Sequence, residues 1–154
     1  MTTNIEHIGN NSNERNEYEL KMLKRIISAH SEDQTKEEKI KFNLISIKLR
    51  MNQYLNNGND TELIPAGIFL NEILNSLKIK KSKFADYIDI ESSNLHAILK
   101  GRRKINNKIA AQIATIFNIN EELWMFIEAK NDLINFKKSV KDSSKNYSIE
   151  ELIS

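Results

Sequence analysis

Nine of the 23 basic residues of this chain lie between residues 78 and 108, together with only three acidic residues. The segment therefore carries a net charge of +6, in a chain whose net charge is only +2. Such a block is typical of a site that binds a polyanion, because lysine and arginine neutralise phosphates. A lysine-rich surface that is merely solvated would have the same composition, so charge alone leaves both interpretations open.

Short polar side chains stand between two basic clusters inside this segment. They fall in the stretch Ser92–Leu99, where Leu95 and Ile98 are at helical spacing and would anchor one face in a core. The opposite face would carry Ser92, Ser93, Asn94, His96, Ala97 and Lys100. Such side chains suit the donors and acceptors that base pairs expose in the major groove. We therefore predict that this face reads DNA bases, with the alternative for His96 that it is exposed and has no role.

The two basic clusters flank this face. One begins at Lys78 and leads into the preceding helix, and the other follows the base-reading helix. The residues that we predict to contact DNA phosphates are Lys80, Lys81, Lys83, Arg102, Arg103, Lys104 and Lys108. Phosphate contacts hold a protein in register on the duplex, whereas base contacts provide the sequence preference.

A pair of short helices must position these side chains. The pattern predicts one helix over 81–88, a tight turn at 89–90 and a second helix at Ser92–Leu99, which together make a helix-turn-helix. Ala85 is small enough to let the two helices cross closely, and Ile90 would plug the turn into the core. The predicted structural core of this unit is Phe84, Ala85, Ile90, Leu95 and Ile98.

Further helices surround this pair. One is predicted over 65–77, and others over 107–117 and from residue 121 onward. Gly101 follows the base-reading helix, where a left-handed backbone favours glycine. Trp124 is at helical spacing with apolar neighbours, so we expect it in the core rather than as a partner contact.

The chain divides at the sequence Asn-Asn-Gly-Asn-Asp, which punctuates it strongly. The expected fold class is all-α, a five-helix helix-turn-helix domain preceded by a helical hairpin. The expected parts are a disordered segment over 1–13, the hairpin and its linker over 14–60, the DNA-binding domain over 61–137 and a flexible tail over 138–154. Within the tail, residues 149–153 could form a weak extra turn.

Apolar periodicity marks the buried faces of the hairpin helices and of the last helix. The residues expected on these faces are Tyr18, Met22 and Ile26 in the first, Ile40, Leu44, Ile47, Met51, Tyr54 and Leu55 in the second, and Leu123, Ile127, Leu133 and Ile134 in the last. Thr35 and Glu38 form a T-x-x-E capping box that would start the second helix.

The composition excludes several classes of chemistry. The chain has no cysteine and four glycines, so it has no cysteine-ligated metal site and too few glycines for a phosphate-binding loop. No Ser-His-Asp arrangement at motif spacing is present, and acidic pairs such as Glu121/Glu122 fit the first turn of a helix. We therefore predict that the protein is not an enzyme, with no catalytic residue, metal or cofactor.

Hydropathy indicates neither a membrane span nor a signal peptide. No apolar run reaches the ~18 residues that a transmembrane helix needs, and the first fifteen residues have no apolar core. The expected location is cytoplasmic, with no membrane partner.

The stretch KIKKSKFADYIDIESSNLHAILKGRRKINNKIAAQIATIFNI resembles the XRE (lambda-repressor-like) family of helix-turn-helix proteins. Pro65–Leu77, the loop Gly101–Ile105 and the segment Asn120–Leu133 are similar to the HigA-type antitoxin subgroup of that family. The resemblance covers residues 64–133. It implies a homodimeric repressor that binds double-stranded operator DNA at its own promoter. It also implies a partner, a RelE-like (HigB-type) toxin that cleaves mRNA and that the repressor neutralises.

Three positions depart from the family pattern. Lys81 stands where the family usually has glutamine, Asp89 where it has glycine, and Glu91 where it has serine or threonine. We expect Lys81 to contact a phosphate and Asp89 to adopt the left-handed backbone at some cost. The Glu91 carboxylate is expected to cap its helix, and near DNA it would either lower the affinity or accept from a cytosine amino group. These changes affect the expected operator sequence, not the fold.

The function has two alternatives. The chain could be a stand-alone transcription regulator without a toxin, or an interaction module whose helix-turn-helix has lost DNA binding. The hairpin over 14–55 could be a dimerisation arm, a toxin-binding module or a cap that completes the core, and the family favours toxin binding.

Overall fold

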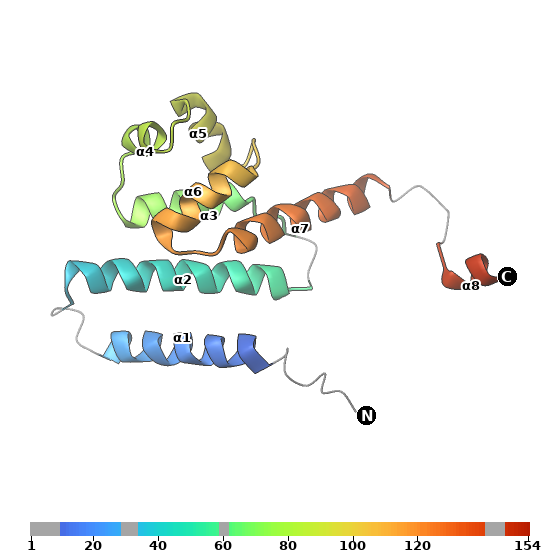
Figure 1. Ribbon diagram of the computed structural model, residues 1–154, viewed down its shortest axis with the longest axis horizontal. Coiled ribbons are helices and arrows are strands. Elements are labelled where there is room, and N and C mark those ends of the chain that lie inside the picture. The colour runs from blue at the N-terminus through green and yellow to red at the C-terminus, as the bar shows by residue number, and fades with distance from the viewer. Residues whose placement is uncertain (1–9, 29–33, 59–61, 141–146) are drawn as a thin grey trace.

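A computed structural model describes residues 10–28, 34–58, 62–140 and 147–154. Those residues form helices and loops, with no strand among them, which confirms the all-α class. The helices are α1 (Asn10–Ser28), α2 (Lys36–Asn56), α3 (Ala66–Ser76), α4 (Lys81–Tyr87), α5 (Ser92–Leu99), α6 (Asn107–Phe117), α7 (Glu121–Ser139) and α8 (Ile149–Ile153). In Figure 1, α2 lies between α1 on one side and the helices α3 to α7 on the other.

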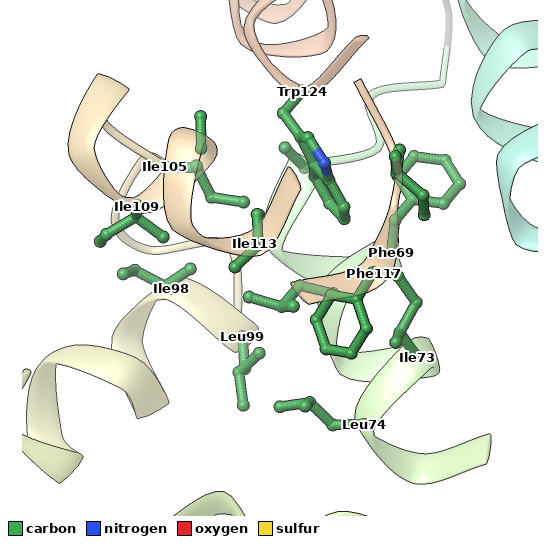
Figure 2. Packing of buried hydrophobic residues seen from close by; sticks show 14 of the residues in the cluster. Phe69, Ile73, Leu74, Ile98, Leu99, Ile105, Ile109, Ile113, Phe117 and Trp124 are labelled. Carbon is green, nitrogen blue, oxygen red and sulfur yellow. The ribbon is translucent and has the colours of Figure 1, made fainter. Parts of the chain in front are cut away.

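A single apolar core holds α3 to α7 together. Trp124 is fully buried in it, as expected, between residues of α3, α5 and α6 (Figure 2). Phe84 of α4 stacks on Phe117 of α6, with ring centroids 5.9 Å apart. Burial of such side chains contributes roughly 1.5–3 kcal/mol each, so this cluster is the main source of stability.

Helix α2 belongs to the same core. Its predicted apolar face is confirmed over the C-terminal half of the helix, because Ile47, Met51 and Tyr54 are buried in the cluster that contains the α3 and α7 side chains. Leu44 and Leu55 pack against this cluster and are partly buried, whereas Ile40, near the start of α2, is partly buried outside it. The linker expected over 56–60 does separate α2 from α3, although residues 59 and 60 lie outside the described residues. α2 thus completes the core of the helix-turn-helix domain.

Polar contacts fix the C-terminal end of α2 to α7. The Tyr54 hydroxyl donates to Asn131 Oδ1 and accepts from the Ile64 backbone N–H at 3.2 Å, and Asn131 Nδ2 donates to the Ile64 carbonyl at 2.8 Å. Lys130 donates to the carbonyls of Tyr54 and Asn57, the second at 2.8 Å. A cation at a helix C-terminus also complements the helix dipole.

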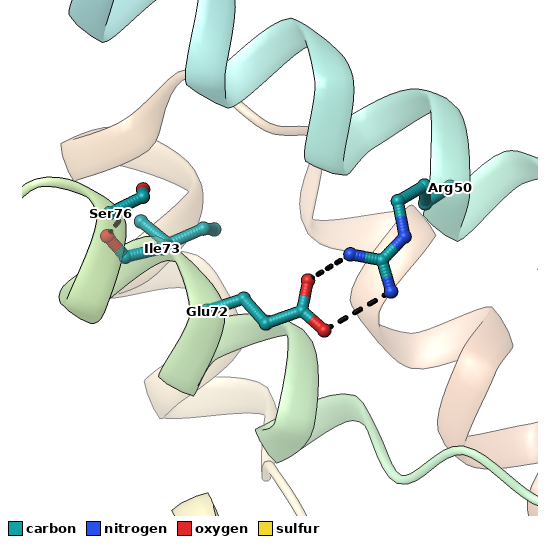
Figure 3. Close-up of polar contacts among 4 residues, drawn as sticks. All are labelled: Arg50, Glu72, Ile73 and Ser76. Carbon is teal, nitrogen blue, oxygen red and sulfur yellow. Dashed lines mark hydrogen bonds and ion pairs between the residues drawn. The ribbon is translucent and has the colours of Figure 1, made fainter.

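An ion pair ties the middle of α2 to α3. The Arg50 guanidinium donates with both terminal nitrogens to the Glu72 carboxylate, one of them at 3.1 Å (Figure 3). The bidentate geometry makes this pair more specific than a single contact, although both side chains keep access to solvent.

Caps define several helix boundaries, including the predicted one at the start of α2. Thr35 and Glu38 make both hydrogen bonds of the capping box. Asn106 and Asn120 accept backbone N–H groups at the starts of α6 and α7, and Asn118 ends α6 with a left-handed backbone at φ 52°. Pro65 is the residue just before α3, so the helix expected over 65–77 begins one residue later.

Helices extend into parts of both segments for which we predict disorder or flexibility, and α8 coincides with the extra turn expected over 149–153. Residues 10–13 belong to α1, because an existing helix gains one hydrogen bond for each residue it adds, even without apolar periodicity. Residues 138–139 belong to α7, and Ser148 caps the short helix α8. Residues 1–9 and 141–146 lie outside the described residues.

Two apolar residues are not where periodicity placed them. Tyr18 is 65% exposed, because α1 packs mainly against α2 and Tyr18 lies outside the face that this packing covers. Leu133 is 60% exposed, whereas its neighbour Ile134 is buried as expected. The Ile26 side chain lies outside the described part of the chain.

Candidate nucleic-acid interface

Helices α4 and α5 form the predicted helix-turn-helix. Asp89 adopts the left-handed backbone at φ 55°, as expected for this turn. Its N–H donates to the Asp86 carbonyl at 3.3 Å, and the next N–H, of Ile90, reaches the Ala85 carbonyl at 3.0 Å. This pair of bonds is the Schellman motif, which turns the chain sharply at a helix end.

The burial of the turn differs in one position from the prediction. Phe84, Ala85, Leu95 and Ile98 are buried as expected. Ile90 is only partly buried against the core, and the fully buried residue of the turn is Ile88, because it closes the last turn of α4.

The same motif ends α3 and α5. The left-handed residues are Lys78 at φ 54° and the predicted Gly101 at φ 72°. At each, the following N–H donates five residues back, from Ile79 to the Leu74 carbonyl at 2.8 Å and from Arg102 to the Ala97 carbonyl at 2.9 Å. The motif at Lys78 was not predicted, since lysine seldom adopts this backbone.

Helix α5 is seated closely on α3. A Cβ atom at Gly67 would lie 1.8 Å from the Ile98 carbonyl oxygen, so only glycine allows this crossing. At the end of α5, a Cβ at Gly101 would lie 2.6 Å from the Pro65 ring. These two contacts fix the position of α5, and therefore of the side chains on its outer face.

The outer face of α5 carries the predicted base-reading residues. Ser92, Ser93, His96 and Lys100 are exposed, while Asn94 and Ala97 are half-buried. Ala97 also has a structural role, because its carbonyl accepts the N–H groups of Arg102 and Arg103.

All seven predicted phosphate-contacting residues are exposed. They come from three places, namely the start of α4 with the residue before it, the loop between α5 and α6, and the first turn of α6. These residues are Lys80, Lys81, Lys83, Arg102, Arg103, Lys104 and Lys108. Both α4 and α5 begin without a side-chain cap, so their first N–H groups lack the partner that capping gives to α2, α6 and α7.

Two of these basic residues have partners within the chain. Arg103 Nη1 donates to Asn94 Oδ1 at 2.8 Å, which joins a predicted phosphate contact to a predicted base reader. Lys104 forms an ion pair with Asp132 of α7. Arg103 is therefore suited to orienting Asn94, and Lys104 is drawn toward α7.

Glu91 does not cap α5 in the way we expected. Its carboxylate makes no bond to a backbone N–H of the first turn. It accepts instead from the Ser93 hydroxyl, at 3.5 Å. The glutamate side chain is one methylene longer than aspartate, which favours the latter as a cap.

Two residues that sequence reasoning missed bind the backbone of the site from the neighbouring helices α6 and α7. Glu128 of α7 is buried and accepts from the Ile105 N–H at 3.1 Å, which secures the basic loop. Burial raises the pKa of Glu128, while the Ile105 N–H and Lys104 act in the opposite sense. Gln112 of α6 donates to the Ile88 carbonyl at 3.0 Å and so braces the turn. Glu128 could have been noticed as an acidic residue in helical register with Trp124.

Neither a metal centre nor a membrane helix was found in the described part of the chain. No group of three or more histidine or acidic side chains there could bind a metal ion. None of the helices within the same ranges is both long and apolar enough to cross a bilayer.

The sequence of this chain is similar to that of a helix-turn-helix regulator found in two strains of Escherichia coli. The chain is 23% identical over 77 residues to the uncharacterised HTH-type transcriptional regulator YbaQ of Escherichia coli K12, and equally to YbaQ of Escherichia coli O6:H1. The match spans 50% of this chain and 68% of the relative. No family model and no solved structure matches. The similarity is therefore to a helix-turn-helix transcriptional regulator.

Proposed function

We propose that this protein is a sequence-specific DNA-binding transcription regulator that represses its own promoter as a homodimer. The observation that carries the proposal is the outer face of α5, which is exposed between two basic flanks and held by the close crossing at Gly67. In a dimer, two such helices would enter successive major grooves about 34–36 Å apart. The similarity to YbaQ supports the same class of function.

A promoter–reporter assay tests the role of α5. The DNA upstream of the gene drives the reporter, and the variant Ser93→Ala/His96→Ala removes two exposed polar groups from the face. We expect the variant to lose repression while Asn135→Ala, an exposed change on α7, retains it. Full repression by the double variant would refute the assignment of α5 as the reader.

We further propose that the regulator is the antitoxin of a HigBA-like module and neutralises a RelE-like toxin by direct binding. The support is the resemblance at Pro65–Leu77, Gly101–Ile105 and Asn120–Leu133. A neighbouring short, basic reading frame should then arrest growth when expressed alone and not when co-expressed with this chain. A neighbour that leaves growth unchanged, or no complex on co-purification, would favour the stand-alone regulator instead.

A further inference from the structure

Helix α7 carries a row of exposed apolar side chains. Phe126, Leu133 and Phe136 are 57%, 60% and 63% exposed, and Ala129 between them is exposed as well. Val140, just past the end of the helix, continues the row and is half-buried. The spacing alternates between three and four residues, which places these side chains in one stripe, as in the seam of a coiled coil.

The stripe faces away from the domain core. Trp124, Ile127, Asn131 and Ile134 form the buried side of the same helix, and a rotation of about 100° per residue puts the stripe on the opposite side. A surface helix normally has one apolar face, which packs on the core, and one polar face. Helix α7 has a second apolar face, which its own domain does not cover. The C-terminal half of α7 also extends past helices α1 to α6 (Figure 1).

We propose that this stripe is the interface between two copies of the chain, with α7 antiparallel to its counterpart. The charges on α7 favour that occupant. Its first turn carries Glu121 and Glu122, and its last turn carries Lys137 and Lys138. This distribution complements the helix dipole, and in an antiparallel pair it also brings acidic ends beside basic ends. A parallel pair would place like charges together.

The spacing defines the register of the pair. With a two-fold axis near residue 131, Phe126 of one copy lies opposite Phe136 of the other, and Ala129 lies opposite Leu133. Large side chains then meet in the outer layers, while the central layers combine a small residue with a large one. Self-complementary pairing of this kind closes as a two-fold dimer and does not extend into a filament.

The area of the stripe indicates a weak dimer. The three large side chains expose about 60% of roughly 200 Å² each, which gives about 700 Å² for two copies before flanking residues are counted. A standard interface buries about 1,600 Å², so we expect dissociation in the micromolar range. Binding of both copies to one operator would strengthen the pair, and only this last step rests on the proposed function.

Sedimentation velocity on the full chain, without DNA, tests the interface. We expect the wild type to shift from monomer to dimer as its concentration rises. Leu133→Lys should raise the dissociation constant about tenfold or more, since it places a charge in the seam. Leu20→Lys is the matched control, because Leu20 is 48% exposed on α1, and it should leave the constant within about twofold. A wild type that stays monomeric at every concentration, or equal effects of the two changes, would overturn the proposal.

Disulfide cross-linking tests the orientation, because the chain has no native cysteine. Phe126→Cys/Phe136→Cys should form covalent dimers on mild oxidation, and Phe136→Cys alone should not. Efficient cross-linking of the single variant would refute the antiparallel arrangement. A monomer that still binds its operator would contradict only this inference, whereas a dimer that binds no DNA would contradict only the proposed function.

Discussion

The close crossing of α3 and α5 predicts that Gly67→Ala damages the protein. The added Cβ would lie 1.8 Å from the carbonyl oxygen and 2.7 Å from the carbonyl carbon of Ile98. Both are backbone atoms, so no side chain can rotate away to make room. The two helices must separate by about 1 Å, and overpacking of this kind typically costs about 1–3 kcal/mol or more.

One gain partly offsets this cost. Alanine is favoured over glycine inside a helix by about 1 kcal/mol. We therefore expect a net loss of about 2 kcal/mol, which corresponds to a fall in Tm of about 4–8 °C for a domain of this size. Because α5 itself must move, we expect DNA affinity to fall as well, by about tenfold, which is equivalent to about one base contact.

Thermal unfolding followed by circular dichroism gives the first quantity, and fluorescence anisotropy with operator DNA gives the second. Gly58→Ala is the matched control, since no heavy atom lies within 4 Å of a Cβ at that position. It should leave the Tm unchanged or raise it slightly. If Gly67→Ala proved as stable as Gly58→Ala, the close crossing would be incorrect.

Four other changes test the roles of Tyr54, Glu128 and the two arginines of the basic loop. Tyr54→Phe should lower the free energy of unfolding by about 1–2 kcal/mol, because Asn131 and the Ile64 N–H lose a hydrogen-bond partner. Tyr87→Phe, at an exposed position, is the control and should leave it unchanged. If urea unfolding gave the two variants the same stability, it would contradict the hydrogen bonds of Tyr54. Glu128→Gln tests the raised pKa of Glu128. A raised pKa stabilises the fold below the unfolded value of 4.5, and this contribution to the free energy of unfolding is lost as pH rises through the folded value. The stability of the wild type relative to Glu128→Gln should therefore fall from pH 4.5 toward neutrality, and a constant difference would refute the assignment. Arg102→Ala should weaken binding to all DNA sequences alike and reduce the slope of log affinity against log salt by about one. Arg103→Ala should also alter the sequence preference, because Asn94 loses its hydrogen-bond donor. Binding-site selection that gives the same preferred sequence for both variants would exclude that role of Arg103.

Helix boundaries were predictable where a residue type dictates the backbone. The capping box at Thr35 and Glu38, the turn at Asp89 and the glycine at Gly101 each act within four residues, so the chain itself shows them. The amphipathic face of α2 was predictable for the same reason, since helical periodicity is local.

Contacts between distant segments were not predictable in this way. No local pattern pairs Gly67 with Ile98, or Glu128 with the Ile105 N–H, because these contacts depend on how the helices cross. Periodicity predicts Leu133 in the core, although it is exposed, because periodicity records apolar character and not which neighbour covers a side chain.

In the candidate site too, local features were predictable from the sequence and contacts between distant segments were not. The exposed residues of α5 and the basic clusters follow from residue type and helical phase, which are local properties. The bond from Arg103 to Asn94 and the ion pair from Lys104 to Asp132 emerge only when loop and helices are assembled. Those two contacts change the expected roles of single residues and leave the proposed interface in place.

The measurement that tests the central proposal most directly is a titration of the full chain against DNA, followed by fluorescence anisotropy. The two duplexes are the DNA upstream of the gene and a scrambled sequence of equal composition, each at several salt concentrations. We expect the upstream duplex to bind at least ~10³-fold more tightly, with log affinity falling linearly as log salt rises. No binding to either duplex at low salt would contradict DNA recognition by the α5 face.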